Sequence, residues 1–285
     1  QSLDFNFMAN KAFLEFCDFL KLEAGISLGA NKEYLVSSRL NRLMSDRNIV
    51  DLGSLLRQVK LPMHRELKQA VIDGMTTNET QWFRDSYPLQ AFADELIPTL
   101  LNDGHNSIRI WSAACSSGQE PYSISMVIDE HRDTYRHLHR HNPDIKIIAT
   151  DLSGQIIQKA RAGRYDKIEI NRGLNGTRKQ NFFTHTVVSE KEEYWELDAT
   201  IKQQVTFQQH NLIDSYAGLG KFDVIFCRNV LIYFSAETKS DILNRMARQL
   251  KPHGYLILGS SESPTNYTDL FKMEKPGGAA VYRLK

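Results

Sequence analysis

Several features are scarce in this chain of 285 residues, and each scarcity excludes a class of protein. The three cysteines, Cys17, Cys115 and Cys227, are far apart and form no C-x-x-C pair. This pattern argues against a disulfide framework and a zinc site, and it predicts a protein of the reducing cytoplasm. No apolar run is long enough to cross a bilayer, so we expect no direct membrane insertion. The formal net charge is only +1, so no overall field draws the chain to nucleic acid.

Residues 1–75 are predicted to form an all-α domain of four short amphipathic helices. Apolar side chains recur at helical spacing in four sets, which begin at Phe13, Val36, Leu52 and Met63. Asp51 is a suitable N-cap for the third helix. Arg39 and Arg42 share the polar side of the second helix, either as a solvated face or as a docking surface.

The stretch SIRIWSAACSSGQEPYSIS, residues 107–125, organises the rest of the chain. It begins as an alternating strand, continues as a turn of small residues, and becomes a helix whose first turn contains Pro121. A small-residue turn between a strand and a helix N-terminus predicts a nucleotide-like ligand on a doubly wound sheet. Only Gly118 is present, so the turn lacks the G-x-G-x-x-G pattern, and an ordinary tight turn is the alternative.

Further strands are expected after this motif. IKIIAT ends at Asp151, a carboxylate placed to accept hydrogen bonds from ribose hydroxyls. VTFQQHNL ends at Asn211 and Leu212, and FDVIFC is followed directly by Arg228 and Asn229. A strand GYLILG and a hairpin around residues 276–278 close the chain.

Two segments depart from the alternation of strands and helices. The histidine-rich stretch 131–143 is expected to be an exposed helix end and loop rather than a metal site. Residues 165–200 predict a small antiparallel insertion, with strands in THTVVSEKEEYWELD. A free strand edge there offers a place for an extended peptide to add.

The segment TTNETQWFRD, residues 76–85, combines polar side chains with Trp82 and Phe83. It is predicted either to cover a binding site or to serve as a linker anchored by its aromatics. With the helix that follows, it forms a linking region over 76–106.

Five strings in order give the chain a specific resemblance. They are TTNETQWFRD, WSAACSSGQEPYSISM, ATDLS, FDVIFCRNVLIYF and GYLILGSSES, behind a helical N-terminal domain. Together they resemble the bacterial chemoreceptor glutamate methyltransferases, the CheR family, over essentially the whole chain. The resemblance implies an α/β, class I S-adenosylmethionine-dependent methyltransferase fold over 107–285, with a doubly wound sheet, a C-terminal antiparallel hairpin and the β insertion. The expected product of the cofactor is S-adenosylhomocysteine.

The resemblance also implies roles for particular residues. The matching positions for cofactor contacts are Asn78, Thr80, Arg84, Glu120, Asp151, Asn211, Leu212, Arg228 and Asn229. Arg84 and Tyr233 occupy the positions proposed to orient the substrate glutamate. From the residues alone, an inter-domain salt bridge for Arg84 and a partly buried aromatic for Tyr233 are the favoured interpretations. The nucleophile is a carboxylate with an unperturbed pKa of roughly 4.3, so no general base is required.

The resemblance also implies binding partners for the N-terminal helices and for the β insertion. The N-terminal helices, with Arg39 and Arg42, would lie against the cytoplasmic helical bundle of a chemoreceptor. Family members that bind a receptor C-terminal pentapeptide share a glycine in the turn of the insertion, and SEKEE contains none. We therefore predict an enzyme that does not depend on this tether. We also expect a monomer, because nothing in the sequence demands a larger assembly.

Other functions remain open at this stage. One is a methyltransferase for a small molecule or RNA, although the neutral charge and the lack of a basic–aromatic stripe argue against RNA. Another is a non-catalytic module that senses S-adenosylmethionine or S-adenosylhomocysteine. A nicotinamide oxidoreductase is disfavoured because the glycine fingerprint is missing.

Overall fold

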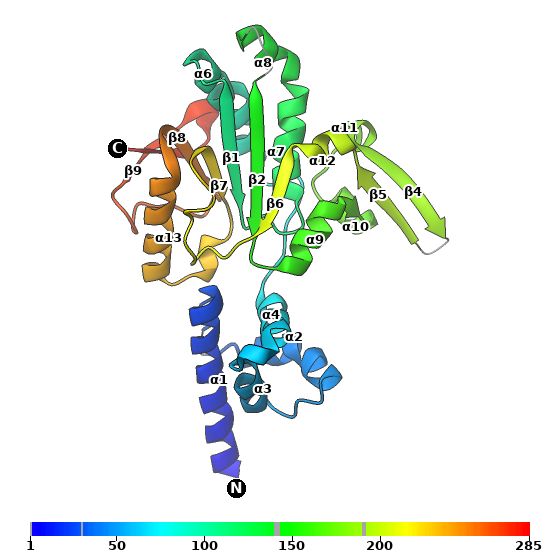
Figure 1. The fold of residues 1–285 in the computed structure, drawn as a ribbon, viewed down its shortest axis with the longest axis vertical. Coiled ribbons are helices and arrows are strands. Elements are labelled where there is room, and N and C mark those ends of the chain that lie inside the picture. Colours follow the sequence, from blue (N-terminus) through cyan, green and yellow to red (C-terminus); the bar gives the residue numbers. More distant parts are fainter. Residues whose placement is uncertain (1, 30, 140–142, 190–191) are drawn as a thin grey trace. The chain divides into compact units, whose positions relative to one another are not determined.

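A computed structural model describes residues 2–29, 31–139, 143–189 and 192–285, with the side chains of 2–10 and 139 excluded. Its internal contacts divide the chain into two compact units (Figure 1). One contains residues 1–77 together with 233–238, and the other contains 78–232 together with 239–285. Each unit is described here by itself.

The first unit is a bundle of helices. They are α1 (Ser2–Ala24), α2 (Glu33–Asp46), α3 (Leu52–Val59), the 3-10 turn η1 (Pro62–His64) and α4 (Arg65–Met75). Phe16, Leu20, Leu55 and Val71 are fully or almost fully buried in its core. The helical periodicity of the sequence accounts for this arrangement, because apolar residues three and four apart share one helix face. The expected all-α N-terminal domain is confirmed.

Local contacts at the helix ends refine the sequence expectations. Asp51 caps α3 by accepting the backbone N–H of Ser54 at 2.7 Å, as predicted. Met63, expected on the apolar face of the fourth helix, instead lies in η1 and is 81% exposed. Pro62 explains the difference, because it starts a separate 3-10 turn before α4 begins.

A seven-stranded sheet forms the centre of the second unit. Its strands are β1 (Ser107–Ala113), β2 (Asp144–Asp151), β6 (Val205–Gln209), β7 (Phe222–Cys227), β8 (Leu250–Leu258), β9 (Phe271–Glu274) and β10 (Val281–Leu284). The order is β6-β2-β1-β7-β8-β10-β9. The first five strands of this order run parallel, whereas β10 pairs antiparallel with both β8 and β9. The doubly wound sheet with a closing antiparallel hairpin is therefore confirmed.

Helical segments precede and connect the strands of this sheet along the chain (Figure 1). They are α5 (Ser86–Ala91), the π-helical η2 (Phe92–Leu96), α6 (Ile97–Asn102), α7 (Gln119–Glu130), α8 (Arg132–His139), α9 (Gly154–Ala162), α12 (Ala199–Gln203), α13 (Ala236–Gln249) and the 3-10 turns η3 (Leu231–Tyr233) and η4 (Pro276–Gly278). All six residues of β7 are buried, as expected for a central parallel strand covered on both faces.

The histidine-rich stretch is largely exposed, as expected, but more of it is helical than predicted. Most of it forms α8, and Tyr135 is 1% exposed, with its hydroxyl donating to the carbonyl of Ala93 at 2.9 Å. His131 bridges the carbonyl of Val127 and the carboxylate of Asp94. The mostly polar composition of this stretch gave no indication that Tyr135 would be buried and anchor the helix. The positions 140–142 lie outside the described residues.

The expected antiparallel insertion is present over about the predicted range, with a third strand and two helices that were not predicted. It pairs β3 (Arg164–Tyr165) and β4 (Phe183–Ser189) with a central β5 (Glu192–Leu197). Two short helices, α10 (Lys167–Asn171) and α11 (Gly176–Phe182), complete it. Figure 1 shows β4 and β5 projecting away from the seven-stranded sheet.

Two features are absent from the residues that the structure describes. No helix among them is long and apolar enough to span a membrane. No group of three or more histidine, cysteine or acidic side chains among them is arranged to hold a metal ion.

Candidate functional site

The turn between β1 and α7 lies at the carboxyl end of β1. Three of its five residues have left-handed backbones: Ala114 (φ 57°), Ser116 (φ 50°) and Gly118 (φ 95°). Non-glycine residues rarely adopt this conformation, and it is held only where surrounding contacts require it. A Cβ on Gly118 would lie 3.1–3.2 Å from Ala160, Tyr122 and the Tyr165 hydroxyl. The glycine is therefore required by packing within the protein, a reason the sequence did not reveal.

Asp151 fastens this turn to the end of β2. Its Oδ2 accepts the backbone N–H of Ser116 at 2.8 Å, and its Oδ1 accepts that of Ser153 at 3.0 Å. The residue is 7% exposed. An ionised carboxylate oxygen accepts more than one hydrogen bond, which is the chemistry that a ribose hydroxyl requires.

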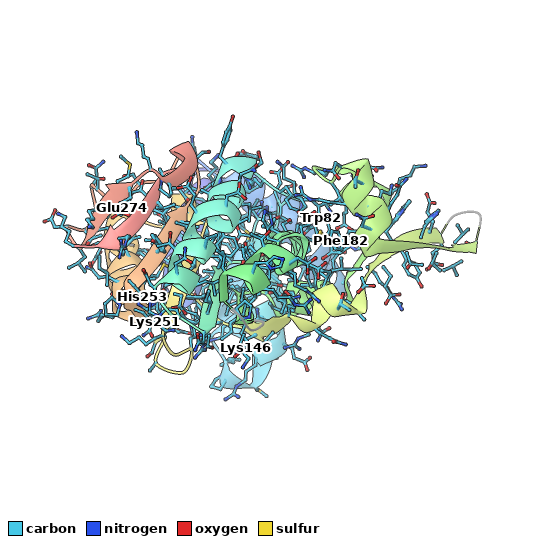
Figure 2. The ribbon with its side chains drawn as sticks, turned by 90° about the horizontal axis from the view of Figure 1, so that it is seen from above. Trp82, Lys146, Phe182, Lys251, His253 and Glu274 are labelled. Atoms are coloured by element: carbon cyan, nitrogen blue, oxygen red, sulfur yellow. The ribbon has the colours of Figure 1, made fainter. Side chains whose placement is uncertain are left out.

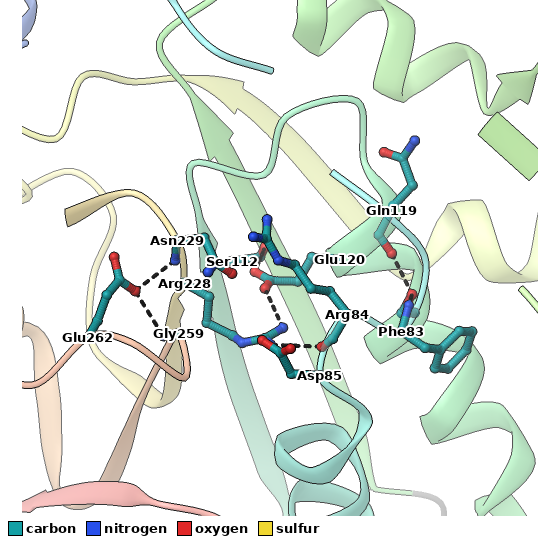
Figure 3. A network of polar contacts seen from close by, with 11 residues as sticks. Phe83, Arg84, Asp85, Ser112, Gln119, Glu120, Arg228, Asn229, Gly259 and Glu262 are labelled. Carbon is teal, nitrogen blue, oxygen red and sulfur yellow. Dashed lines mark hydrogen bonds and ion pairs between the residues drawn. The ribbon is translucent and has the colours of Figure 1, made fainter. Parts of the chain in front are cut away.

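Glu120 and Arg228 form the buried centre of the site (Figure 3). Glu120 accepts the Ser112 hydroxyl at 2.8 Å and an Arg228 guanidinium N–H at 3.3 Å. Burial raises the pKa of Glu120, while the Arg228 charge acts in the opposite direction. The Arg228 side chain is only 2% exposed, so this pair is held in a low-dielectric environment.

Arg228 also holds the loop that precedes α5. Its Nη2 donates to the carbonyl of Arg84 at 2.7 Å and to the Asp85 carboxylate at 3.1 Å. Arg228 was predicted as a cofactor contact, and both of its terminal nitrogens serve protein acceptors. Its Nε is buried and has no hydrogen-bond partner within the described part of the chain.

The segment 78–85 lies against the turn and against the insertion. The Asn78 carbonyl accepts the Ser116 hydroxyl at 3.0 Å. Trp82 is fully buried, and it donates its ring N–H to the Glu169 carbonyl and its backbone N–H to the Arg172 carbonyl. Thr80 is half-buried. Trp82 also packs edge-on against Tyr165 and Phe183, so it anchors the segment as both interpretations require, and the binding role of the segment stays a prediction.

Arg84 and Tyr233 fall in different units of the structure. Arg84 is half-buried, and its guanidinium makes no ion pair with any described residue. Tyr233 ends η3 and is also half-buried, and its carbonyl accepts the backbone N–H of Ser27 at 2.9 Å. The segment 233–238 is accordingly grouped with the helical unit.

Asn211 and Leu212 follow the edge strand β6. Leu212 is buried, and the Asn211 side chain accepts the backbone N–H of Ile213 at 3.2 Å. Next to them, the backbone N–H of His210 donates to the Asp151 carbonyl at 2.8 Å, which joins the ends of β6 and β2. Burial lowers the pKa of His210, which favours the neutral ring.

Sequence reasoning missed four residues of this region: His210, Ser112, Asp85 and Glu262. Ser112, His210 and Glu262 stand inside quoted strings, and Asp85 ends one, but nothing in their spacing marks a role. Their importance depends on contacts between distant segments. Glu262, for example, accepts the backbone N–H groups of Asn229, Leu231 and Gly259.

Comparison with known proteins now decides the family. Residues 78–277 match the model described as "CheR methyltransferase, SAM binding domain", and residues 11–76 match "CheR methyltransferase, all-alpha domain". This chain belongs to the CheR methyltransferase family. It is 48% identical to chemotaxis protein methyltransferase 1 of Pseudomonas aeruginosa, over 97% of this chain and 99% of that protein.

Two further relatives agree with the CheR assignment. Chemotaxis protein methyltransferase Cher2 of Pseudomonas putida is 46% identical, over 97% of this chain and 98% of the relative. The chemotaxis protein methyltransferase of Vibrio parahaemolyticus is 45% identical, over 98% of both chains. The resemblance seen in the five strings is confirmed.

The cofactor of this CheR chain is S-adenosylmethionine, as predicted. The groups gathered at the carboxyl ends of the strands fit it chemically. S-adenosylmethionine presents an ammonium group and two ribose hydroxyls, all hydrogen-bond donors, and Glu120 and Asp151 supply carboxylate acceptors. The buried His210 Nε2, without a hydrogen-bond partner among the described residues, lies beside the predicted adenine neighbourhood.

Proposed function

We propose that this enzyme transfers the methyl group of S-adenosylmethionine to glutamate side chains of chemoreceptors, forming glutamate methyl esters. Membership of the CheR family, with near-complete coverage of relatives named chemotaxis protein methyltransferases, carries this proposal. A carboxylate oxygen of the glutamate would form a bond to the methyl carbon as the carbon–sulfur bond breaks. The electron pair of that bond stays on sulfur, giving S-adenosylhomocysteine, and no proton is transferred.

The protein's part in this reaction is alignment and exclusion of water. Arg84 would hold one oxygen of the glutamate, because its guanidinium is not committed to an ion pair in the described structure. It must bind weakly enough to leave the other oxygen nucleophilic. Tyr233 would donate a hydrogen bond that orients the same carboxylate.

The cofactor roles are assigned to groups at the carboxyl ends of the strands. Glu120 would bind the amino acid portion of the cofactor, and Asp151 its ribose. Asn78, Thr80 and Asn229 would contact the cofactor near the reacting centre, with Asn211 and Leu212 around the adenine. For Arg228 the contacts favour an indirect role, since it holds Glu120 and the Arg84 carbonyl in place.

We also propose a role for each of three parts of the chain. Residues 1–75 would dock on the receptor, 76–106 would contribute to the cofactor site, and 107–285 would bind the cofactor, with the insertion at about 165–200. Docking would take place on the cytoplasmic helical bundle of the receptor, by a monomeric enzyme acting in the cytoplasm.

The two arginines of α2 differ as docking residues. Arg42 is 94% exposed, with only a 3.8 Å pair to Asp46. Arg39 donates to the carbonyls of Met75 and Thr76 at the end of α4, at 2.7 and 3.2 Å, so it supports the helical fold as well. Arg42 is therefore the cleaner probe of a docking surface.

Independence from a receptor C-terminal pentapeptide remains our proposal. It rests on the absence of glycine from the turn SEKEE, of which residues 190–191 lie outside the described structure. Titration calorimetry with the C-terminal peptide of a cognate receptor tests it directly. Low-micromolar binding would contradict tether independence without affecting the assigned reaction.

The decisive experiment measures transfer of radiolabelled methyl groups from S-adenosylmethionine to receptor-containing membranes. We expect base-labile label on the receptor with the wild type. Arg84→Ala and Tyr233→Phe should lose the label while still binding S-adenosylhomocysteine, and Arg136→Ala, at an exposed position on α8, should behave as the wild type. Cofactor binding without receptor labelling would instead indicate another substrate or a sensor module.

A further inference from the structure

Glu262 is a nearly buried carboxylate that, among the described residues, accepts hydrogen bonds from backbone N–H groups. It follows the end of β8 and is 9% exposed. Its Oε2 accepts the N–H groups of Asn229 and Gly259 at 2.7 and 2.8 Å, and its Oε1 accepts that of Leu231 at 2.8 Å (Figure 3 shows the first two). We propose that Glu262 is a positioning residue for methyl transfer, which fixes the backbone at Asn229; this inference rests on the proposed function.

The segment that Glu262 holds has an unfavourable backbone. Asn229 adopts φ 58°, a left-handed conformation that asparagine tolerates better than most residues but that still needs support. A carboxylate that receives two or three N–H groups makes strong, charge-assisted bonds. Glu262 therefore supplies the support that keeps the residues after β7 in this conformation.

Gly259 shows how closely the segments approach. A Cβ at this position would lie 2.7 Å from Glu262 Oε2 and 2.9 Å from both the backbone nitrogen and the side-chain Nδ2 of Asn229. No side chain fits there without displacing the carboxylate or the asparagine. The glycine and the glutamate thus form one clamp between the carboxyl ends of the neighbouring strands β7 and β8.

The clamp is linked to the proposed reacting groups through the chain itself. Arg228 directly precedes Asn229, and its guanidinium holds the Arg84 carbonyl at 2.7 Å and Glu120 at 3.3 Å. A shift of residues 228–229 therefore moves the anchor of the residue proposed to orient the substrate. A displacement of about 1 Å at such a point can lower a rate by about 100-fold.

Glutamine at position 262 would keep the shape and break the clamp. One end of its amide is an NH2 group, which would face an N–H of Leu231 or those of Asn229 and Gly259, so donors would oppose donors. The clamp does not depend on a salt bridge, because Glu262 makes no ion pair with the described residues. Because the Glu262 charge also raises the pKa of Glu120, Gly259→Ala, which keeps this charge, is measured beside Glu262→Gln to isolate positioning by hydrogen bonds.

Asp223 provides a matched control at the opposite ends of the same two strands. This fully buried carboxylate accepts the Arg109 backbone N–H at 2.8 Å, Lys251 at 2.8 Å and His253 at 2.7 Å. Figure 2 shows Lys251 and His253 next to each other. Asp223→Asn weakens three hydrogen bonds to a buried carboxylate, two of them from the side chains of Lys251 and His253, and touches none of the proposed site residues.

The test uses the full chain and compares Glu262→Gln with Asp223→Asn. We measure kcat and KM on receptor membranes, binding of S-adenosylhomocysteine, thermal midpoints, and hydrogen exchange at the amides of residues 229 and 231. Both variants should unfold at lower temperature. Only Glu262→Gln should lose kcat, by about 10- to 100-fold well below its midpoint, with less change in S-adenosylhomocysteine affinity. Only Glu262→Gln should lose exchange protection at these amides.

Equal losses of kcat in the two variants, or an unchanged kcat in Glu262→Gln, would overturn the proposal. If Glu262→Gln does not fold, Gly259→Ala takes its place, since it keeps the carboxylate and pushes it away from Asn229. If the wild type methylates no receptor, the proposed function fails, and the exchange measurement still decides whether the clamp exists: retained protection in Glu262→Gln refutes it.

Discussion

Replacing Arg228 by methionine would remove the charge at the centre of the buried network. Methionine fills much of the same volume, but Glu120, whose side chain is 15% exposed, would lose its cation. At 3.3 Å and an effective dielectric constant of about 20, the lost attraction is roughly 5 kcal/mol. Part of this is offset because arginine no longer has to be desolvated, and breaking buried pairs typically costs about 3–5 kcal/mol.

The Arg228→Met variant should therefore lose about 3 kcal/mol of unfolding free energy near pH 8. For a unit of this size, the loss corresponds to a fall in the thermal midpoint of about 6–12 °C. The control Arg42→Met removes an arginine that is 94% exposed, and its stability should change by less than about 0.5 kcal/mol.

The pH dependence of the stability loss in Arg228→Met tests whether Glu120 causes that loss. Burial raises the pKa of Glu120, and the Arg228 charge lowers it. Removing Arg228 should therefore raise the pKa of Glu120 further. A carboxyl group with a raised pKa binds more protons when folded, so stability falls as pH rises from the ordinary value toward the raised one. Each unit of additional shift is worth about 1.4 kcal/mol. The deficit of Arg228→Met should thus be smaller near pH 5 than near pH 8.

Chemical denaturation at the two pH values measures this difference. In the double variant Arg228→Met/Glu120→Gln, no buried charge remains at position 120, and we expect most of the stability to return with no dependence on pH. A deficit for Arg228→Met that is the same at both pH values, or below about 1 kcal/mol, would refute the reasoning.

Three further predictions follow from close packing and from a second buried carboxylate. Gly118→Ala should lower S-adenosylhomocysteine affinity by more than about tenfold in calorimetry, because a Cβ is strained at φ 95° and would press on three side chains at 3.1–3.2 Å, which shifts the turn; unchanged affinity would contradict this. Gly173→Ala should lower the thermal midpoint and expose Trp82 to fluorescence quenchers, since its Cβ would lie 2.2 Å from the Trp82 carbonyl oxygen; unchanged quenching would contradict this. In the wild type, burial opposes ionisation of Asp223, but hydrogen bonds from Arg109, Lys251 and His253 outweigh it and lower its pKa. That contribution to stability should be present above the ordinary pKa and lost as the pH falls below it, whereas Asp223→Asn should lose stability chiefly above the ordinary pKa.

The amino-acid sequence alone was sufficient for the fold class, the family and the cofactor. Periodic apolar residues predicted the N-terminal helices, and the strand–turn–helix at residues 107–130 predicted a doubly wound sheet. These features are local, since they depend on residues three or four apart or on a single turn. Five ordered strings then identified the family, which is why the cofactor could be named before any contact was known.

Only the tertiary structure decided which residues support one another. Arg228 lies far along the chain from Glu120 and Asp85, and Glu262 lies about thirty residues beyond Asn229. No local pattern joins such pairs; the parallel sheet does, because it brings the carboxyl ends of strands distant in sequence to one edge. The burial of Tyr135 on α8 was missed for the same reason, since its partner Ala93 lies 42 residues earlier in the chain. The sequence thus determined the chemistry that is present, and the packing determined which groups are held in place to use it.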